Sequence, residues 1–97
     1  MLPDKNKILE TLSDLQPMIR QKYGVTRIGI FGSVARGQGG PESDVDIVVE
    51  MQPDLFKRAC LKDELESILG RKVDIVRYRP MMNKFLKKRI DNEGHYV

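Results

Sequence analysis

A glycine-serine turn and two aspartates are the residues of this chain whose types and spacing could do chemistry. Gly32 and Ser33 are followed, after ten residues, by Asp44 and Asp46. Side chains two apart on a β-strand point to the same face, so both carboxylates would aim at one spot, about 7 Å apart along the strand. The turn follows an apolar strand and looks like the start of a short helix, whose free amides favour a phosphate. We therefore expect a hard cation and a phosphate to meet in one cleft.

A third carboxylate, Asp74, sits between Val73 and Ile75 in a predicted strand. Burial of an unpaired charge there would be costly, so Asp74 needs a cation, a hydrogen-bond partner or an exposed sheet end. If its strand lies beside that of Asp44 in matched register, three carboxylates converge and repel one another unless divalent cations compensate them. Mg²⁺ is the natural choice for oxygen ligands and phosphates. Two such ions, roughly 3.5–4 Å apart, could clamp the attacking and leaving oxygens of a phosphoryl displacement.

Helices and strands that must position these residues alternate along the chain. Apolar residues recur at helical spacing from Ile8 to Ile19, and Pro17 predicts a break near Gln16. The order αβαβαβα predicts one α/β (α+β) domain over residues 1–97, with helices packed on a short sheet. Strands are expected over 25–31, 44–50 and 71–78, with a short edge strand or frayed end at 93–97; further helices follow Pro53 and span Met81 to Ile90, and a loop spans Gly37 to Pro41.

Alternating residues predict which faces are buried. Val45, Ile47 and Val49 would face the core, while Asp44 and Asp46 face the other way. Asp54 can cap the helix after Pro53, and Gly70 can end it. Two sets of apolar residues supply the buried sides of the later helices: Phe56, Ala59, Cys60, Leu61, Leu65, Ile68 and Leu69 in one, and Met82, Phe85, Leu86 and Ile90 in the other.

Composition limits the class of protein. The 97 residues are 40% hydrophobic and 32% charged, which is typical of an ordinary soluble domain. The formal net charge of +3 is modest, so direct nucleic-acid binding is not predicted. The single cysteine, Cys60, excludes an internal disulfide framework and a cysteine-rich zinc site. No apolar stretch approaches the roughly 20 residues that span a bilayer, and a cytoplasmic protein with no membrane contact is expected.

The spacing of these residues resembles the nucleotidyltransferase superfamily typified by DNA polymerase beta, and within it the minimal nucleotidyltransferase (MNT) domains. The resemblance runs from the strand at Thr26 to Phe31, through Gly32-Ser33-x10-Asp44-x-Asp46, to Lys72-Val73-Asp74-Ile75-Val76. It implies a mixed sheet on which Asp44 and Asp46 bind both Mg²⁺ ions, while Asp74 completes the shell of the catalytic ion and helps activate the nucleophile.

The same resemblance assigns roles to the turn. Gly32 and Ser33 would hold the β and γ phosphates of a nucleoside triphosphate, ATP by analogy, while an acceptor hydroxyl attacks the α-phosphorus and pyrophosphate leaves. Arg36, one helical turn after Ser33, could reach the departing pyrophosphate or simply cover the surface. His95 is expected to be an exposed polar residue, and the cations from Lys84 to Arg89 a solvated helix face.

From a length of 97 residues, we expect no separate acceptor lobe. Domains of this length resemble the antitoxins of HEPN/MNT toxin-antitoxin modules, whose partner is an all-helical HEPN ribonuclease toxin. The resemblance implies neutralisation by transfer of AMP from ATP to a tyrosine of that partner. Two alternatives stay open: an antitoxin that inhibits its partner mainly by contact, and a nucleotidyltransferase for small molecules such as aminoglycosides, completed by a second subunit.

Overall fold

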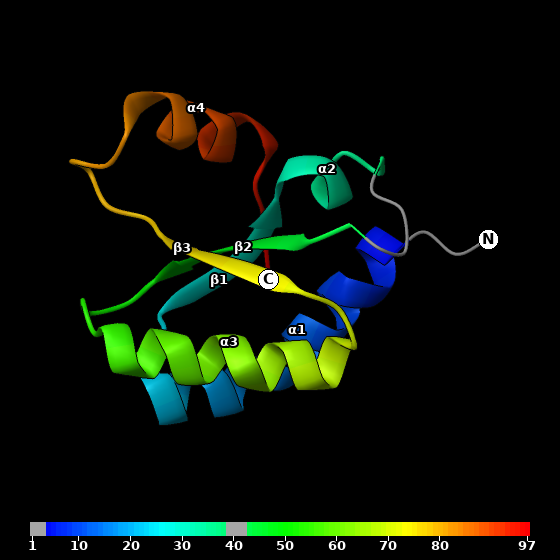
Figure 1. The fold of residues 1–97 in the computed structure, drawn as a ribbon, viewed down its shortest axis with the longest axis vertical. Coiled ribbons are helices and arrows are strands. Elements are labelled where there is room, and N and C mark those ends of the chain that lie inside the picture. Colours follow the sequence, from blue (N-terminus) through cyan, green and yellow to red (C-terminus); the bar gives the residue numbers. More distant parts are fainter. Residues whose placement is uncertain (1–3, 39–42) are drawn as a thin grey trace.

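A computed structural model describes residues 4–38 and 43–97 of the chain. Its helices and strands alternate as the sequence predicts, and the C-terminal residues form a short edge strand (Figure 1). Residues 39–41 of the predicted loop lie outside the described residues. The elements are α1 (Asp4–Tyr23), β1 (Arg27–Phe31), α2 (Gly32–Ala35), β2 (Val45–Glu50), α3 (Leu55–Leu69), β3 (Val73–Arg77), α4 (Lys84–Glu93) and β4 (His95–Tyr96).

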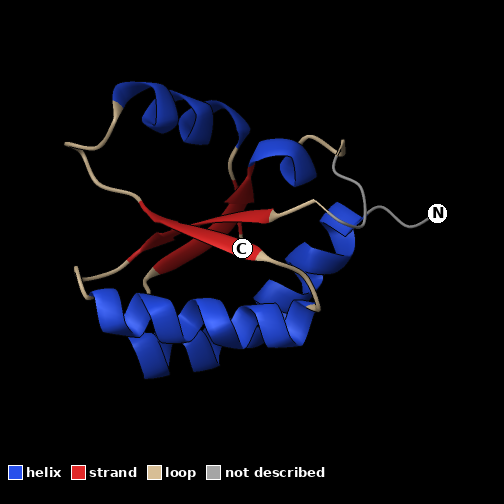
Figure 2. Ribbon diagram, in the orientation of Figure 1, coloured by secondary structure: helices blue, strands red, loops and turns tan. Residues whose placement is uncertain are grey.

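The four strands form one mixed sheet in the order β3-β2-β1-β4. β1 runs antiparallel to both β2 and β4, whereas β2 and β3 are parallel. A parallel pair needs a crossover connection, which α3 provides. Figure 2 shows the sheet between two helical layers, with α1 and α3 on one face and α4 on the other. The small α+β architecture with a mixed sheet is therefore confirmed.

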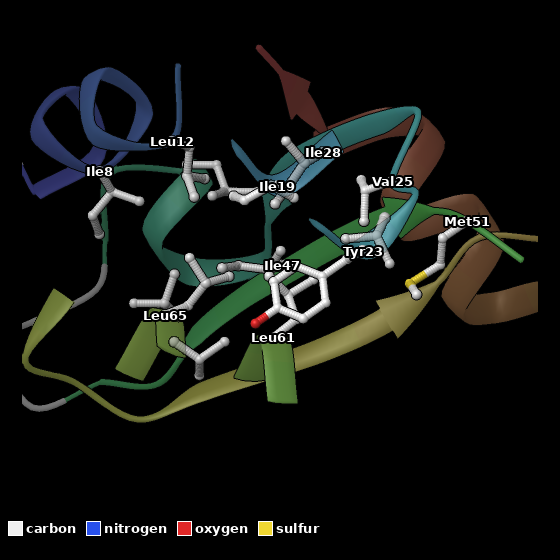
Figure 3. Close-up of a cluster of buried hydrophobic side chains, with 14 of the residues drawn as sticks. Ile8, Leu12, Ile19, Tyr23, Val25, Ile28, Ile47, Met51, Leu61 and Leu65 are labelled. Atoms are coloured by element: carbon white, nitrogen blue, oxygen red, sulfur yellow. The ribbon is translucent and has the colours of Figure 1, made fainter. Parts of the chain in front are cut away.

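The larger hydrophobic core lies between the sheet and the layer of α1 and α3 (Figure 3). Val45, Ile47 and Val49 are buried in it, as their alternation predicts. Val48 points to the opposite face, where a second cluster forms beneath α4 from Phe31, Val48, Met82 and Ile90. The carboxylates of β2 share this second face, so the site lies on the α4 side of the sheet.

The predicted break at Pro17 is wrong, because α1 is one continuous helix. Proline has no N–H, so Pro17 leaves the carbonyl group of Ser13 without its helical hydrogen bond. Both Pro17 and Ser13 lie on the exposed side of α1. Leu12 and Ile19 are fully buried on either side of the proline. Packing on both flanks therefore keeps the helix continuous at a position where water can satisfy the backbone.

The later helices bury less than their sequences predict. Asp54 accepts a hydrogen bond from the Lys57 amide, and Gly70 ends α3 with a φ of 68°, so both predicted ends are confirmed. Only Leu61 and Leu65 of α3 are fully buried, while Phe56, Ala59 and Ile68 are exposed, contrary to expectation. α3 contacts the molecule along one narrow stripe, and its other sides meet solvent.

The last predicted helix begins later than expected, at Lys84, where Asn83 caps its first turn through the Phe85 and Leu86 amides. Phe85 is 83% exposed, so its assignment to the buried side is also wrong. His95 is exposed in β4, as predicted. Among the described helices, none is long and apolar enough to cross a membrane.

Candidate active site

Two of the three predicted carboxylates are direct neighbours on the sheet. Asp46 of β2 pairs in parallel register with Asp74 of β3, and the Val45 amide donates to the Lys72 carbonyl at 2.9 Å where the two strands begin. Side chains at paired positions of adjacent strands point to the same face and lie about 5 Å apart at their origins. Asp44 lies one residue before β2, at the same end of the sheet. The matched register on which convergence depends is confirmed.

The half-buried Asp46 is the electrostatic centre of this group. Burial raises the pKa of its carboxyl group above the ordinary value of 3.8, and the neighbouring Asp74 raises it further, with a smaller contribution from Asp44. Arg89 and Arg36 act in the opposite direction by stabilising the charged form. The carboxylates therefore repel one another, and the two arginines compensate them only in part.

Gly32 lies against Asp46 where β1 passes into α2. Its φ is +76°, and a Cβ at this position would overlap the Oδ2 atom of Asp46. Phe31, which precedes α2, provides no side-chain cap for the amides of the first turn. Ser33 follows as the second residue of α2 and is half-buried. The structure thus places the predicted glycine-serine turn beside Asp46, one of the three predicted carboxylates.

Arg36 is held at the exposed end of α2. Its Nη1 lies 3.0 Å from Oε1 of Glu93, and its Nε donates to Oε1 of Gln38 at 3.1 Å. Sequence reasoning missed Glu93, and it assigned Arg89 to a solvated face. The Arg89 guanidinium lies 5.8 Å from the centroid of the Phe31 ring, and its Nε is 4.0 Å from Glu93. The only signal for this cluster in the sequence is the i, i+4 spacing of Arg89 and Glu93.

Two polar contacts support the backbone beside the aspartates. Nη2 of Arg71 donates to the Ser43 carbonyl at 2.7 Å, immediately before Asp44. The Val73 amide, immediately before Asp74, donates to Oε2 of Glu66 at 2.9 Å. These contacts tie the starts of β2 and β3 to α3 and to the turn that follows it.

No three acidic, histidine or cysteine side chains within residues 4–38 and 43–97 form a closed metal-binding group. The three aspartates share one end of the sheet without surrounding a single point. Their oxygen donors nevertheless suit Mg²⁺, which proteins usually bind through one or two carboxylates, with water and substrate phosphates completing the shell. The donor set therefore fits a metal that arrives with a phosphate.

Residues 6–97 match the family model described as a nucleotidyltransferase domain. The chain belongs to this family. It is 45% identical over 81 residues to the protein adenylyltransferase MntA of Thermococcus cleftensis, and the aligned region covers 81% of each chain. Among solved structures, it resembles a chain described as a minimal nucleotidyltransferase, with 34% identity, a TM-score of 0.72 and coverage of 92% of this chain and 95% of that one.

A second similar structure is a toxin-antitoxin crystal structure with AMP-PNP, at 31% identity and a TM-score of 0.67, covering 95% of this chain and 70% of that one. The resemblance inferred from the sequence is thus confirmed at the level of family and fold. In this nucleotidyltransferase, the carboxylates lie at one end of the sheet, on the starts of β2 and β3, and the glycine turn follows the end of β1.

Proposed function

We propose that this chain is a Mg²⁺-dependent protein adenylyltransferase that acts as an antitoxin by transferring AMP from ATP to a tyrosine of a HEPN ribonuclease toxin. The observation that carries the proposal is the register pairing of Asp46 with Asp74, with Gly32 packed against Asp46. Membership of the nucleotidyltransferase family supports the reaction type. The name of the Thermococcus cleftensis relative supports a protein as the acceptor.

Asp44, Asp46 and Asp74 are the residues that would hold Mg²⁺. When bound, the metal supplies positive charge that stabilises the reacting phosphates. Burial and the nearby Asp74 both raise the pKa of Asp46, and this cost of holding its negative charge supports a cation at this place. Gly32 and Ser33 would contact the β and γ phosphates through the amides of the first turn of α2.

The proposed reaction forms one bond to phosphorus and breaks another. The phenolic oxygen of the acceptor tyrosine attacks the α-phosphorus of ATP, the bond to the β-phosphate oxygen breaks, and pyrophosphate leaves. Asp74 is the carboxylate we assign to activating the tyrosine, by accepting the phenolic proton as the new bond to phosphorus forms. Arg36 would exchange its contact with Glu93 for the departing pyrophosphate, to which a guanidinium can bind through two parallel hydrogen bonds.

The proposed partner is a HEPN toxin. The toxin-antitoxin complex among the similar solved structures, which contains AMP-PNP, supports both an ATP substrate and a protein partner. Among the described residues, five large apolar side chains on α3 and in or before α4 are exposed to solvent, which suits a protein partner: Leu55, Phe56, Ile68, Met81 and Phe85.

The proposal predicts that a helical HEPN toxin is encoded beside this gene, and intact-mass analysis of that protein tests the proposal directly. After incubation with this protein, ATP and Mg²⁺, we expect the toxin mass to rise by one or more AMP groups, and fragmentation to place them on tyrosine. The Asp44→Asn/Asp46→Asn variant should abolish the shift, because it removes metal charge while preserving shape. A matched control, Asp14→Asn/Asp63→Asn, removes two exposed carboxylates elsewhere and should retain full transfer.

The same variants separate the proposal from its alternatives. If Asp44→Asn/Asp46→Asn still protects cells from the toxin and the toxin mass never changes, the protein inhibits by contact. If no helical toxin is encoded nearby and an aminoglycoside gains AMP instead, the acceptor is a small molecule. Either result would overturn the proposed protein acceptor.

A further inference from the structure

A second candidate site lies where β2 and β3 end, at the opposite end of the sheet from the catalytic aspartates. It is a cavity of about 320 Å³ beside the start of α3. In Figure 1 the loops that follow these two strands lie on the left, whereas α2 lies on the right. The lining residues are Pro53, Asp54, Leu55, Arg58, Arg77 and Arg79.

The two sites also use different faces of the sheet. Arg77 is three residues after Asp74, and side chains an odd number of residues apart on a strand point to opposite faces. Arg77 pairs in register with Val49, which is buried in the core beneath α1 and α3. The cavity therefore belongs to the α3 side of the sheet and shares no lining residue with the carboxylate site.

Three arginines converge on this cavity without a carboxylate partner. Within residues 4–38 and 43–97, none of Arg58, Arg77 and Arg79 forms an ion pair. One nitrogen of Arg77 donates to the Met51 carbonyl at 3.5 Å, and one of Arg79 donates to the Arg77 carbonyl at 3.2 Å. Most of the guanidinium donors, of which each arginine has five, are therefore left for a ligand.

The surroundings strengthen the positive potential. Arg58 and Arg77 are half-buried, so water screens their mutual repulsion less than on an open surface. Asp54, the cap of α3, also lines the cavity and accepts a hydrogen bond from the Lys57 amide at 2.9 Å, and its charge offsets one of the three arginines. The cavity sits at the start of a 15-residue helix, whose dipole adds positive charge there. A bound anion would compensate this excess of positive charge.

We propose that this cavity is a second ligand site, which binds the phosphate group of a compact phosphorylated molecule. Guanidinium groups match the geometry of phosphate oxygens, to which each can donate two parallel hydrogen bonds. The volume of about 320 Å³ lies at the lower end of the range for small-molecule pockets, which favours a compact ligand over an extended strand. Leu55, 74% exposed at the rim, offers an apolar surface to the remainder of the ligand.

Amide NMR with isotope-labelled protein in EDTA tests the site apart from the proposed catalysis. Without metal, the carboxylate end repels anions, so added phosphate or AMP should perturb the amides of residues 55–58 and 77–79 and saturate. Adenosine, which lacks the phosphate, should bind at least about tenfold more weakly than AMP. Tighter binding of AMP than of inorganic phosphate would show that the site prefers a nucleotide. Equal binding would show that the site recognises the phosphate group alone.

The Arg58→Gln/Arg79→Gln variant should weaken AMP binding at least about 100-fold, because two charge-assisted contacts are lost. The matched control, Lys57→Gln/Lys62→Gln, removes the same charge from exposed positions of α3 and should change binding less than about threefold. Unchanged amide spectra elsewhere would show that both variants fold.

Four results would overturn the proposal: perturbations confined to residues 32–36, no saturation by any probe, equal weakening in the lysine control, or binding of a single-stranded RNA but not of AMP or phosphate. None of these readouts uses AMP transfer. The site can therefore fail while the proposed adenylyltransferase activity stands, and the reverse also holds.

Discussion

The α-carbon of Gly32 packs so closely against the carboxylate of Asp46 that a methyl group in place of its hydrogen would overlap Oδ2. The contact joins the turn after β1 to the second residue of β2. Gly32 also adopts a φ of +76°, where residues with a Cβ are strained. Two independent constraints therefore require glycine at this position.

Gly32→Ala should destabilise the fold and disrupt the site together. We expect the free energy of unfolding to fall by about 2–3 kcal/mol, from backbone strain plus the displacement of Asp46. Transfer activity should fall at least about 100-fold, because small displacements of reacting groups have effects of that size. Urea denaturation and the rate of AMP transfer measure the two effects.

Gly24→Ala is the matched control for Gly32→Ala. Gly24 has a similar φ of +71°, but a Cβ there would meet no atom within 4 Å. This variant should lose only about 1 kcal/mol of stability and keep its activity. Equal activity loss in both variants would contradict a specific role for the contact between Gly32 and Asp46.

Asp46→Asn should make the metal-free protein more stable at neutral pH. The folded state raises the pKa of Asp46 through burial and the nearby Asp74, so the ionised carboxylate is less favourable there than in the unfolded chain. An amide of similar shape removes that cost. Thermal denaturation in EDTA should therefore give a higher midpoint for the variant.

Mg²⁺ provides the control for the stability of Asp46→Asn. Added Mg²⁺ should raise the denaturation midpoint of the original protein and leave that of Asp46→Asn nearly unchanged, because a ligand stabilises only the state that binds it. A variant less stable than the original protein in EDTA would refute the destabilisation that burial and Asp74 are expected to impose on the ionised Asp46.

The pairing of Asp46 with Asp74 was within reach of the sequence, whereas the cations around it were not. Alternation of apolar and polar residues sets which side of a strand faces the core, so two carboxylates on neighbouring strands could be expected on one face. Arg89 lies near Phe31, and Glu93 near Arg36, only because α4 lies over the end of β1. That arrangement is set by tertiary packing far along the chain, which local spacing does not encode.

The errors in the predicted helices have a related cause. Pro17 destabilises a helix locally, yet the burial of Leu12 and Ile19 on either side of it outweighs this cost. The apolar spacing in α3 predicted that Phe56 and Ile68 are buried, but both are exposed. Such a pattern tells which residues share a side of a helix, and it does not tell whether another element covers that side. Local signals were reliable where they concerned the backbone itself, as at Asp54 and Gly70.

Pro17→Ala should stabilise the protein without affecting activity. Pro17 is exposed inside a continuous α1, so alanine restores a backbone hydrogen bond and removes a steric conflict with the preceding turn. We expect a gain of about 1–2 kcal/mol in the free energy of unfolding, after allowance for the more flexible unfolded chain. Ser13→Ala, one turn earlier on the exposed side, should gain only about 0.5 kcal/mol. Equal gains would refute a local penalty at Pro17.

The acid dependence of stability should contain a contribution from Glu64, which links α3 to α1. The Tyr23 hydroxyl donates to Oε1 of Glu64 at 2.5 Å, and Nζ of Lys22 lies 3.0 Å from the same oxygen. The hydrogen bond from Tyr23, followed by that from Lys22, lowers the pKa of Glu64 below its ordinary value of 4.5. A lowered pKa in the folded state means that the ionised carboxylate stabilises the fold above pH 4.5, and that this contribution is lost as the pH falls through the folded pKa.

Glu64→Gln should therefore be less stable than the original protein at pH 7, with a difference that shrinks as the pH falls below 4.5. The reason is that protonated glutamic acid, like glutamine, is neutral and cannot pair with Lys22. Urea denaturation at a series of pH values measures the difference between the two proteins. Glu10→Gln, on an exposed position of α1, is the control and should show no such convergence. A difference between Glu64→Gln and the original protein that stays constant from neutral to acid pH would show that Glu64 acts through packing alone, because only an ionised group loses its contribution on protonation.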